Sequence, residues 1–105
     1  MTYDTERGRE AEVTVMMADL RGFTRMVEKL APAGAVALLD AGLTLLARPI
    51  LAAGGIVDKY IGDGVLAYFE GPGHAEIALA TAERILATID ADNAANAGRA
   101  PWRVG

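Results

Sequence analysis

Two aspartates lie where predicted strands end, and they are the side chains best placed to do chemistry. Asp19 follows the apolar run EVTVMMA, and Asp63 lies in the turn of IVDKYIGDGVLAYFE. A carboxylate is costly to bury unless a cation meets it, and two converging carboxylates raise one another's pKa. Bound divalent cations keep both carboxylates ionised. Because no His or Cys accompanies them, these oxygen ligands favour Mg²⁺ or Mn²⁺ over zinc.

The residues after Asp19 add a phosphate site. In RGFT, the backbone N–H groups of Gly22, Phe23 and Thr24 are predicted to lie at a helix N-terminus, where unpaired donors and the helix dipole attract anions. Glycine at position 22 lets the backbone approach a phosphate closely. Two carboxylates beside such a cradle are suited to metal-assisted phosphoryl or nucleotidyl transfer. Taken singly, however, Asp19 is better explained as a helix cap and Asp63 as a turn residue.

Hydropathy patterns predict the elements that position these residues. Residues 12–18 form an apolar, β-branched run typical of a strand covered on both faces, and residues 19–22 are predicted to turn. Residues 23–30 have the apolar spacing of a short helix. Pro32 suits the first turn of a second helix, which Pro49 should kink or end. The predicted buried stripe of this second helix comprises Val36, Leu39, Leu43 and Leu46.

The second half of the chain predicts a hairpin, a third helix and the start of another strand. The Asp-Gly pair between two β-rich runs is a strong hairpin signal. Pro72 opens the third helix, which is predicted over residues 74–91; residues 93–98 form a loop, and PWRVG begins a strand. The apolar side of the third helix comprises Ile77, Ala80, Ala82, Ile85 and Ile89. The order β-α-α-β-β-α-β predicts an α+β fold with helices on one face of an antiparallel sheet, which brings both aspartates to one rim.

Length and composition indicate one globular domain. We divide the 105 residues into a charged lead-in over residues 1–10 and a domain over residues 11–105. A net charge of −4, with scattered basic residues, argues against nucleic-acid partners and direct membrane contact. The sequence has no cysteine, which excludes disulfides and thiolate sites. We recognise no signal peptide and no apolar stretch long enough to span a bilayer, so a cytoplasmic location is expected.

Two stretches, EVTVMMADLRGFTRMVEKL and GGIVDKYIGDGVLAYF, closely resemble the N-terminal half of the class III adenylate/guanylate cyclase catalytic domain. The resemblance covers residues 11–105 and implies a ferredoxin-like βααββαβ core that works as a head-to-tail dimer. It implies that Asp19, Asp63 and the backbone carbonyl of Leu20 bind two Mg²⁺ or Mn²⁺ ions. One ion would lower the pKa of the ribose 3′-hydroxyl, which attacks the α-phosphate of ATP to give cyclic AMP and pyrophosphate.

By the same resemblance, the residue type at position 59, a lysine, indicates which nucleotide is the substrate. Adenylate cyclases carry a lysine at this position, four residues before the metal-binding aspartate, whereas guanylate cyclases carry a glutamate. A donor suits the adenine N1 acceptor, and an acceptor suits the guanine N1–H. Lys59 therefore favours ATP over GTP. In a homodimer it would serve the site whose metals are held by the partner chain; without the motif, Lys59 would be an exposed strand lysine.

The chain also departs from the family pattern. It ends before the second adenine-selecting residue and before the Asn and Arg that stabilise the transition state, so we expect negligible activity and marginal stability from these 105 residues alone. Gly42 and Pro49 are unusual for the second helix and should weaken its packing. A guanylate cyclase, a non-catalytic cyclase-like dimerisation or regulatory domain and, more distantly, another nucleotidyl cyclase or a polymerase-like palm remain alternatives; the IGDG turn fits class III better than the acidic turn of a diguanylate cyclase.

Overall fold

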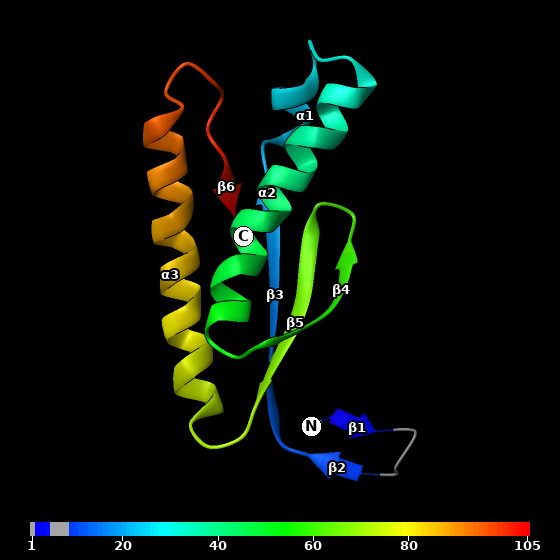
Figure 1. Ribbon diagram of the computed structural model, residues 1–105, viewed down its shortest axis with the longest axis vertical. Helices are drawn as coiled ribbons and strands as arrows, with labels where there is room; N and C mark the ends of the chain where they lie inside the picture. The colour runs from blue at the N-terminus through cyan, green and yellow to red at the C-terminus, as the bar shows by residue number, and fades with distance from the viewer. Residues whose placement is uncertain (1, 5–8) are drawn as a thin grey trace.

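The computed structural model describes residues 2–4 and 9–105. Its elements are, in chain order, β1 (Thr2–Asp4), β2 (Arg9–Ala11), β3 (Val13–Arg21), α1 (Phe23–Val27), α2 (Pro32–Ala52), β4 (Ile56–Ile61), β5 (Gly64–Glu70), α3 (His74–Ala95) and β6 (Arg103–Val104). The two shortest early strands, β1 and β2, pair with each other antiparallel. Part of the predicted charged lead-in is therefore a small hairpin, which lies beyond one end of the main sheet (Figure 1).

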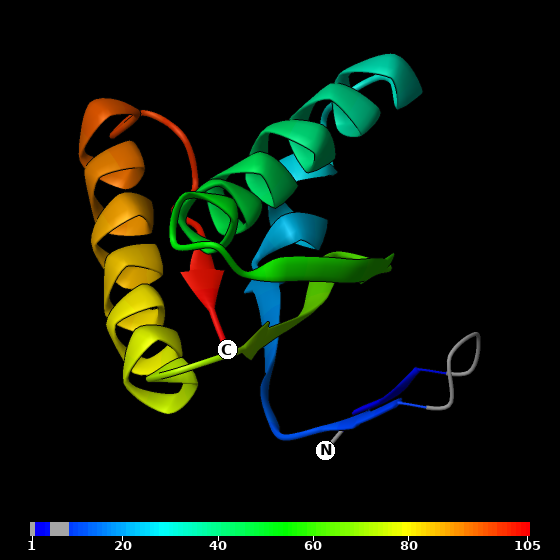
Figure 2. The same cartoon turned by 60° about the horizontal axis from the view of Figure 1, so that its bottom comes forward.

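The main sheet has four antiparallel strands in the order β4-β5-β3-β6. The helices α2 and α3 lie on one of its faces (Figures 1 and 2). Side chains on the other face of β3 are open, because Val15 is 58% exposed and Met17 is 51% exposed. The predicted α+β fold and its element order are confirmed.

The predicted turn over residues 19–22 is wrong, because β3 continues through Arg21. The C-terminal strand supplies the reason. The N–H of Asp19 donates to the Gly105 carbonyl (3.1 Å) and the N–H of Gly105 donates to the Asp19 carbonyl (2.9 Å), while Leu20 and Arg21 pair with β6. A distant segment thus gives these residues strand partners that no local pattern could reveal.

The buried stripe of α2 is displaced toward its C-terminal half. Leu46 and Ile50 are fully buried, whereas Val36, predicted to be buried, is 61% exposed. The first turns of α2 extend past the ends of β4 and β5 (Figures 1 and 2), so the sheet does not cover Val36. Pro49 does not end the helix, which continues to Ala52.

Gly42 of α2 corrects a second expectation, since it tightens the packing of this helix. A Cβ atom at Gly42 would lie 2.7 Å from Leu20 Cδ1 and 2.8 Å from Trp102 Cη2. Both neighbours are themselves buried. The glycine therefore lets α2 approach β3 and the segment before β6 at a distance that alanine would prevent.

The third helix begins at His74, as predicted, and continues to Ala95, so the first half of the predicted 93–98 loop is helical. Its buried residues are Ala78, Thr81, Ile85 and Ile89. Ile77 and Ala80, predicted to be inward, are exposed. The contact face is therefore rotated from the prediction: the row that begins at Ala78 is buried, where the helix packs against α2, β3 and β5.

Within the described residues, α2 is the one helix long and apolar enough, by length and composition, to cross a membrane. The expectation that no segment has that length is therefore wrong. The core helix of a globular domain can be equally long and apolar. Here α2 buries Leu46 and Ile50 in the domain core, and 28% of its most apolar window is buried.

Candidate functional site

The ends of β3 and β5 bring the two predicted metal ligands to the same rim of the sheet. The antiparallel register places Asp19 opposite Gly64, the residue directly after Asp63. The backbone N–H of Leu20 donates to the carbonyl oxygen of Asp63 at 2.9 Å. Both aspartate side chains are partly exposed. Residues far apart in the sequence are therefore adjacent in space, as the strand order predicts.

Gly64 makes room for the carboxylate of Asp19. A Cβ atom at Gly64 would collide with Asp19 Oδ1 and would lie 3.0 Å from the Ala18 carbonyl oxygen. Contacts this short force atoms to move. The glycine after Asp63 thus has a role beyond the turn, because it seats the acidic side chain of the neighbouring strand.

The two carboxylates have no protein partner among the described residues, in which neither Asp19 nor Asp63 forms a side-chain hydrogen bond or ion pair. The same residues contain no group of three or more His, Cys, Asp or Glu side chains suited to a metal. A cation at this rim would therefore take two carboxylates, with its other ligands from the backbone, water or substrate. Magnesium commonly accepts such a ligand set.

The predicted phosphate segment forms the start of α1. Gly22 precedes the helix with φ of 88°, in the left-handed region that favours glycine. No side chain caps the helix, so its first N–H groups, including those of Phe23 and Thr24, keep their capacity to bind an anion. α1 spans only Phe23–Val27, shorter than the predicted 23–30 helix.

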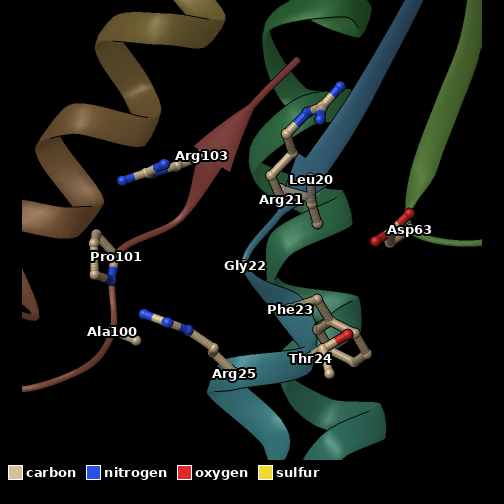
Figure 3. Close-up of a pocket in the computed structure, with 10 residues that line it drawn as sticks. All are labelled: Leu20, Arg21, Gly22, Phe23, Thr24, Arg25, Asp63, Ala100, Pro101 and Arg103. Atoms are coloured by element: carbon tan, nitrogen blue, oxygen red, sulfur yellow. The ribbon is translucent and has the colours of Figure 1, made fainter.

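A pocket of about 700 Å³ lies between this helix start, the hairpin turn and the C-terminal segment. Its lining includes every predicted residue of the phosphate segment, together with Leu20 and Asp63. Figure 3 shows Asp63 approaching from the hairpin, opposite the segment that leads into β6. Asp19 is not among the lining residues; the alternation along β3 places it on the open face of the sheet with Val15 and Met17.

Three arginines that sequence analysis did not select also line the pocket: Arg21, Arg25 and Arg103. Arg25 extends from α1 toward residues 100–101, and Arg103 extends from β6 (Figure 3). With Asp63 as the one acidic lining residue, the pocket has an excess of positive charge and suits a polyanion. Arg21 and Arg25 bracket the GFT segment and could have been noticed; nothing local marks Arg103, which only the β3–β6 pairing brings here.

The predicted base-selecting lysine does not line this pocket. Lys59 lies on the edge strand β4 and its side chain is 59% exposed, with Nζ 3.7 Å from Asp58 Oδ2. Its strand register places it opposite Leu66, which lies opposite Met17 of β3. Lys59 therefore lies on the same sheet face as Asp19 and is separated from it by β5. An exposed ion pair of this kind contributes little to stability.

Comparisons with known proteins place this geometry in context. No family model matches the chain. An adenylate cyclase from Anabaena cylindrica is 35% identical to it over 81 residues, which are 77% of this chain and 16% of that protein. The crystal structure of the guanylyl cyclase Cya2 matches 89% of this chain, and 50% of its own, with a TM-score of 0.74 and 30% identity.

A bacterial light-regulated adenylyl cyclase is a further structural match, with a TM-score of 0.66 and 30% identity over 76% of this chain and 41% of its own. The chain thus spans at most half the length of these three proteins. The matches include both adenylyl and guanylyl cyclases, so they agree on the kind of domain and differ in the nucleotide that their names specify.

Proposed function

This chain belongs to the class III nucleotide cyclase family, as part of its catalytic domain, and from that premise we propose that it serves an adenylate cyclase. The proposed reaction converts ATP to 3′,5′-cyclic AMP and pyrophosphate. The ribose 3′-oxygen forms a bond to the α-phosphorus, the bond from the α-phosphorus to the bridging oxygen breaks, and the hydroxyl proton is released. The observation that carries the proposal is the pairing of Asp19 with the Asp63 turn beside an arginine-lined pocket.

Asp19, Asp63 and the Leu20 carbonyl are the residues that would hold the two divalent cations. The donor set fits, because unpaired carboxylate oxygens at one rim are the hard ligands that Mg²⁺ and Mn²⁺ prefer. When bound, such ions lower the pKa of a hydroxyl and neutralise phosphate charge. The chain itself would supply the two carboxylates at one rim, Asp19 from β3 and Asp63 from the hairpin turn.

The pocket would bind the triphosphate. Backbone N–H groups at the start of α1 can donate to phosphate oxygens, and Arg25 and Arg103 supply guanidinium groups at the side of the pocket away from Asp63 (Figure 3). Arginine binds phosphate through two parallel hydrogen bonds, which fixes orientation as well as charge. The leaving pyrophosphate would therefore be stabilised by groups already in place.

Lys59 would select adenine across a dimer interface. Its exposure and its place on the open sheet face with Asp19 support contact with a second subunit. Val15 and Met17 add exposed apolar surface on this face, as expected of an interface. A guanylate cyclase is the second candidate, favoured by the likeness to the guanylyl cyclase Cya2, and a non-catalytic dimerisation domain is the third.

A chimera tests the proposal, because the chain alone is expected to lack transition-state residues. The chain would replace the matching half of Cya2, and the same junction rejoined to the native Cya2 half would be the positive control. We expect Mg²⁺- or Mn²⁺-dependent release of pyrophosphate and cyclic nucleotide, lost in Asp19→Asn and Asp63→Asn and retained in Asp90→Asn. A folded, dimeric chimera without turnover, beside an active positive control, would contradict the proposal.

A further inference from the structure

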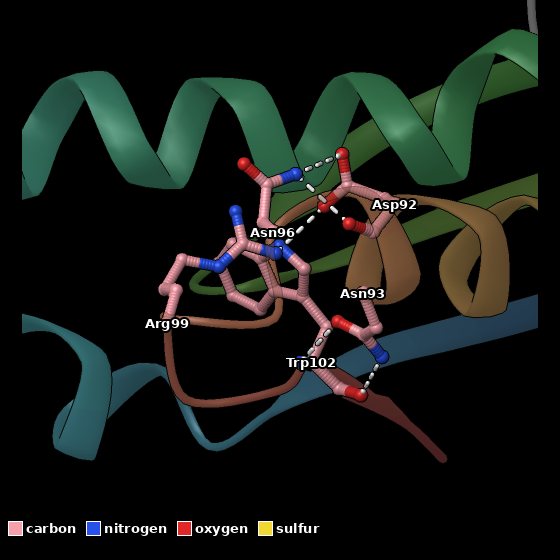
Figure 4. Close-up of polar contacts among 5 residues, drawn as sticks. All are labelled: Asp92, Asn93, Asn96, Arg99 and Trp102. Atoms are coloured by element: carbon pink, nitrogen blue, oxygen red, sulfur yellow. Dashed lines mark hydrogen bonds and ion pairs between the residues drawn. The ribbon is translucent and has the colours of Figure 1, made fainter.

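Asn93, near the C-terminal end of α3, clamps the backbone of Trp102. Its Nδ2 donates to the Trp102 carbonyl oxygen at 2.9 Å, and the Trp102 N–H donates to its Oδ1 at 2.8 Å (Figure 4). One side-chain amide thus satisfies both backbone groups of one residue. The pair of bonds resembles a strand ladder and fixes the peptide units on either side of Trp102.

The clamped residue directly precedes Arg103, which lines the pocket. The peptide unit that carries the Trp102 carbonyl also carries the N–H of Arg103, so the bond to Asn93 sets the direction in which that arginine leaves the backbone. β6 itself spans only Arg103–Val104. So short a strand has few ladder bonds of its own to hold its start in place.

The Trp102 ring also connects the segment held by Asn93 to α1. It is 2% exposed and stacks on Phe23, with ring centroids 6.4 Å apart and planes inclined by 2°. Gly42 lies against its edge, which leaves no room for the ring to shift toward α2. The Arg99 guanidinium lies 5.6 Å from the ring centroid and pairs with Asp92 Oδ2 at 2.7 Å, which closes the loop after α3.

We propose that Asn93 is a positioning residue for polyphosphate binding, acting through Trp102 to hold Arg103 in the pocket. The proposal rests on the function proposed above, because it takes the pocket as the triphosphate site. Asn93 does not line the pocket and would not touch the ligand. Loss of its amide would leave Arg103 charged and present, but no longer held in one direction, so the binding free energy of that arginine would be reduced.

Asn96 provides a matched control on the same helix end. Its Nδ2 bonds to the Asp92 carbonyl (2.8 Å) and to Asp92 Oδ1 (3.5 Å), and it makes no bond to Trp102 (Figure 4). Asn96→Ala therefore removes a similar number of side-chain hydrogen bonds from the end of α3. The two variants differ in whether the start of β6 loses its clamp.

The experiment is calorimetric titration of the 105-residue chain with inorganic tripolyphosphate and Mg²⁺, while circular dichroism verifies folding. We expect Asn93→Ala to weaken binding about tenfold, the loss of one charge-assisted contact, and Asn96→Ala to stay within about twofold. Arg103→Ala should weaken binding similarly, and Asn93→Ala should add nothing in that background. If Asn93 only stabilised the fold, the loss of binding caused by Asn93→Ala would persist in the Arg103→Ala background. The single tryptophan, Trp102, gives an independent fluorescence readout of the bound state.

The outcomes separate this inference from the proposed function. Two outcomes would overturn the role of Asn93 while the wild type still binds tripolyphosphate. Either both asparagine variants lose the same affinity, or the loss from Asn93→Ala persists undiminished in the Arg103→Ala background. Neither outcome would contradict the pocket as the triphosphate site. No binding by the folded wild type would overturn both. If Asn93→Ala does not fold, Asn93→Asp replaces it, because it keeps the acceptor for the Trp102 N–H and loses only the donor. It should show a loss comparable to that of Asn93→Ala, with the same cancellation, because the bond to the Trp102 carbonyl is the one that directs Arg103.

Discussion

The backbone N–H of Leu20 is hydrogen-bonded to the carbonyl oxygen of Asp63 at 2.9 Å. This bond joins the end of the first strand of the main sheet to the hairpin turn between β4 and β5. Because Leu20 follows Asp19, the bond holds the two acidic residues at one rim whatever their side chains do. The backbone hydrogen bonds of the sheet thus position the candidate metal site, and substitutions that disturb these bonds should weaken cation binding there.

Gly64→Ala should damage both stability and cation binding. The added methyl group would meet the Asp19 carboxylate and the Ala18 carbonyl oxygen, and overpacking of this kind costs about 1–3 kcal/mol. Urea denaturation would measure the loss of unfolding free energy. Gly98→Ala is the control, because a Cβ there meets nothing within 4 Å. Equal stability of the two variants would show that Asp19 is not held against Gly64.

Two glycines of α2 should respond to alanine with opposite signs. Alanine favours a helix by about 1 kcal/mol over glycine, and at Gly34 its Cβ would be in ordinary contact, 3.7 Å from Leu30 Cβ. Gly34→Ala should therefore stabilise the chain. At Gly42 the methyl group would collide with Leu20 and Trp102, at a cost of about 1–3 kcal/mol, so Gly42→Ala should lower the melting temperature. A stabilising Gly42→Ala would disprove the close packing described above.

Asp19→Asn and Asp63→Asn should each abolish binding of Mg²⁺ or Mn²⁺ to the chain, because each removes one of two charged ligands. Their unfolding free energies without metal should be unchanged or slightly higher, since a repulsion between like charges is relieved. Calorimetric titration and thermal denaturation measure the two effects. Asp90→Asn, on the exposed side of α3, is the matched control; cation binding that survives either site variant would remove the basis for a shared metal.

Lys59→Glu should shift the nucleotide preference of the active chimera from ATP toward GTP. A carboxylate accepts from the guanine N1–H, whereas the lysine donates to adenine N1. The ratio of cyclic AMP to cyclic GMP formed from equal substrate concentrations is the measurement. Lys29→Glu makes the same charge change at an exposed position after α1, outside the hairpin that carries Lys59. An identical ratio in the two variants would mean that Lys59 does not contact the base.

Patterns local to the chain determined most of the secondary structure and the rim that the site occupies. Strand runs and the Gly-Asp-Gly turn are signals of short range, and the order of elements then brings Asp19 and Asp63 together for topological reasons. The same local patterns were misleading at Val36 and Ile77, because a helix periodicity shows which residues are apolar and not which of them another element covers.

Tertiary structure alone decided the rest. The strand character of Asp19–Arg21, the place of Arg103 in the pocket and the need for glycine at positions 42 and 64 all depend on atoms supplied by distant segments. Such contacts have no local signature, because each residue type is acceptable on its own and becomes necessary only when another element packs against it. The sequence by itself therefore determined which chemistry the chain can support, and the packing of β6 and α3 decided which further residues take part.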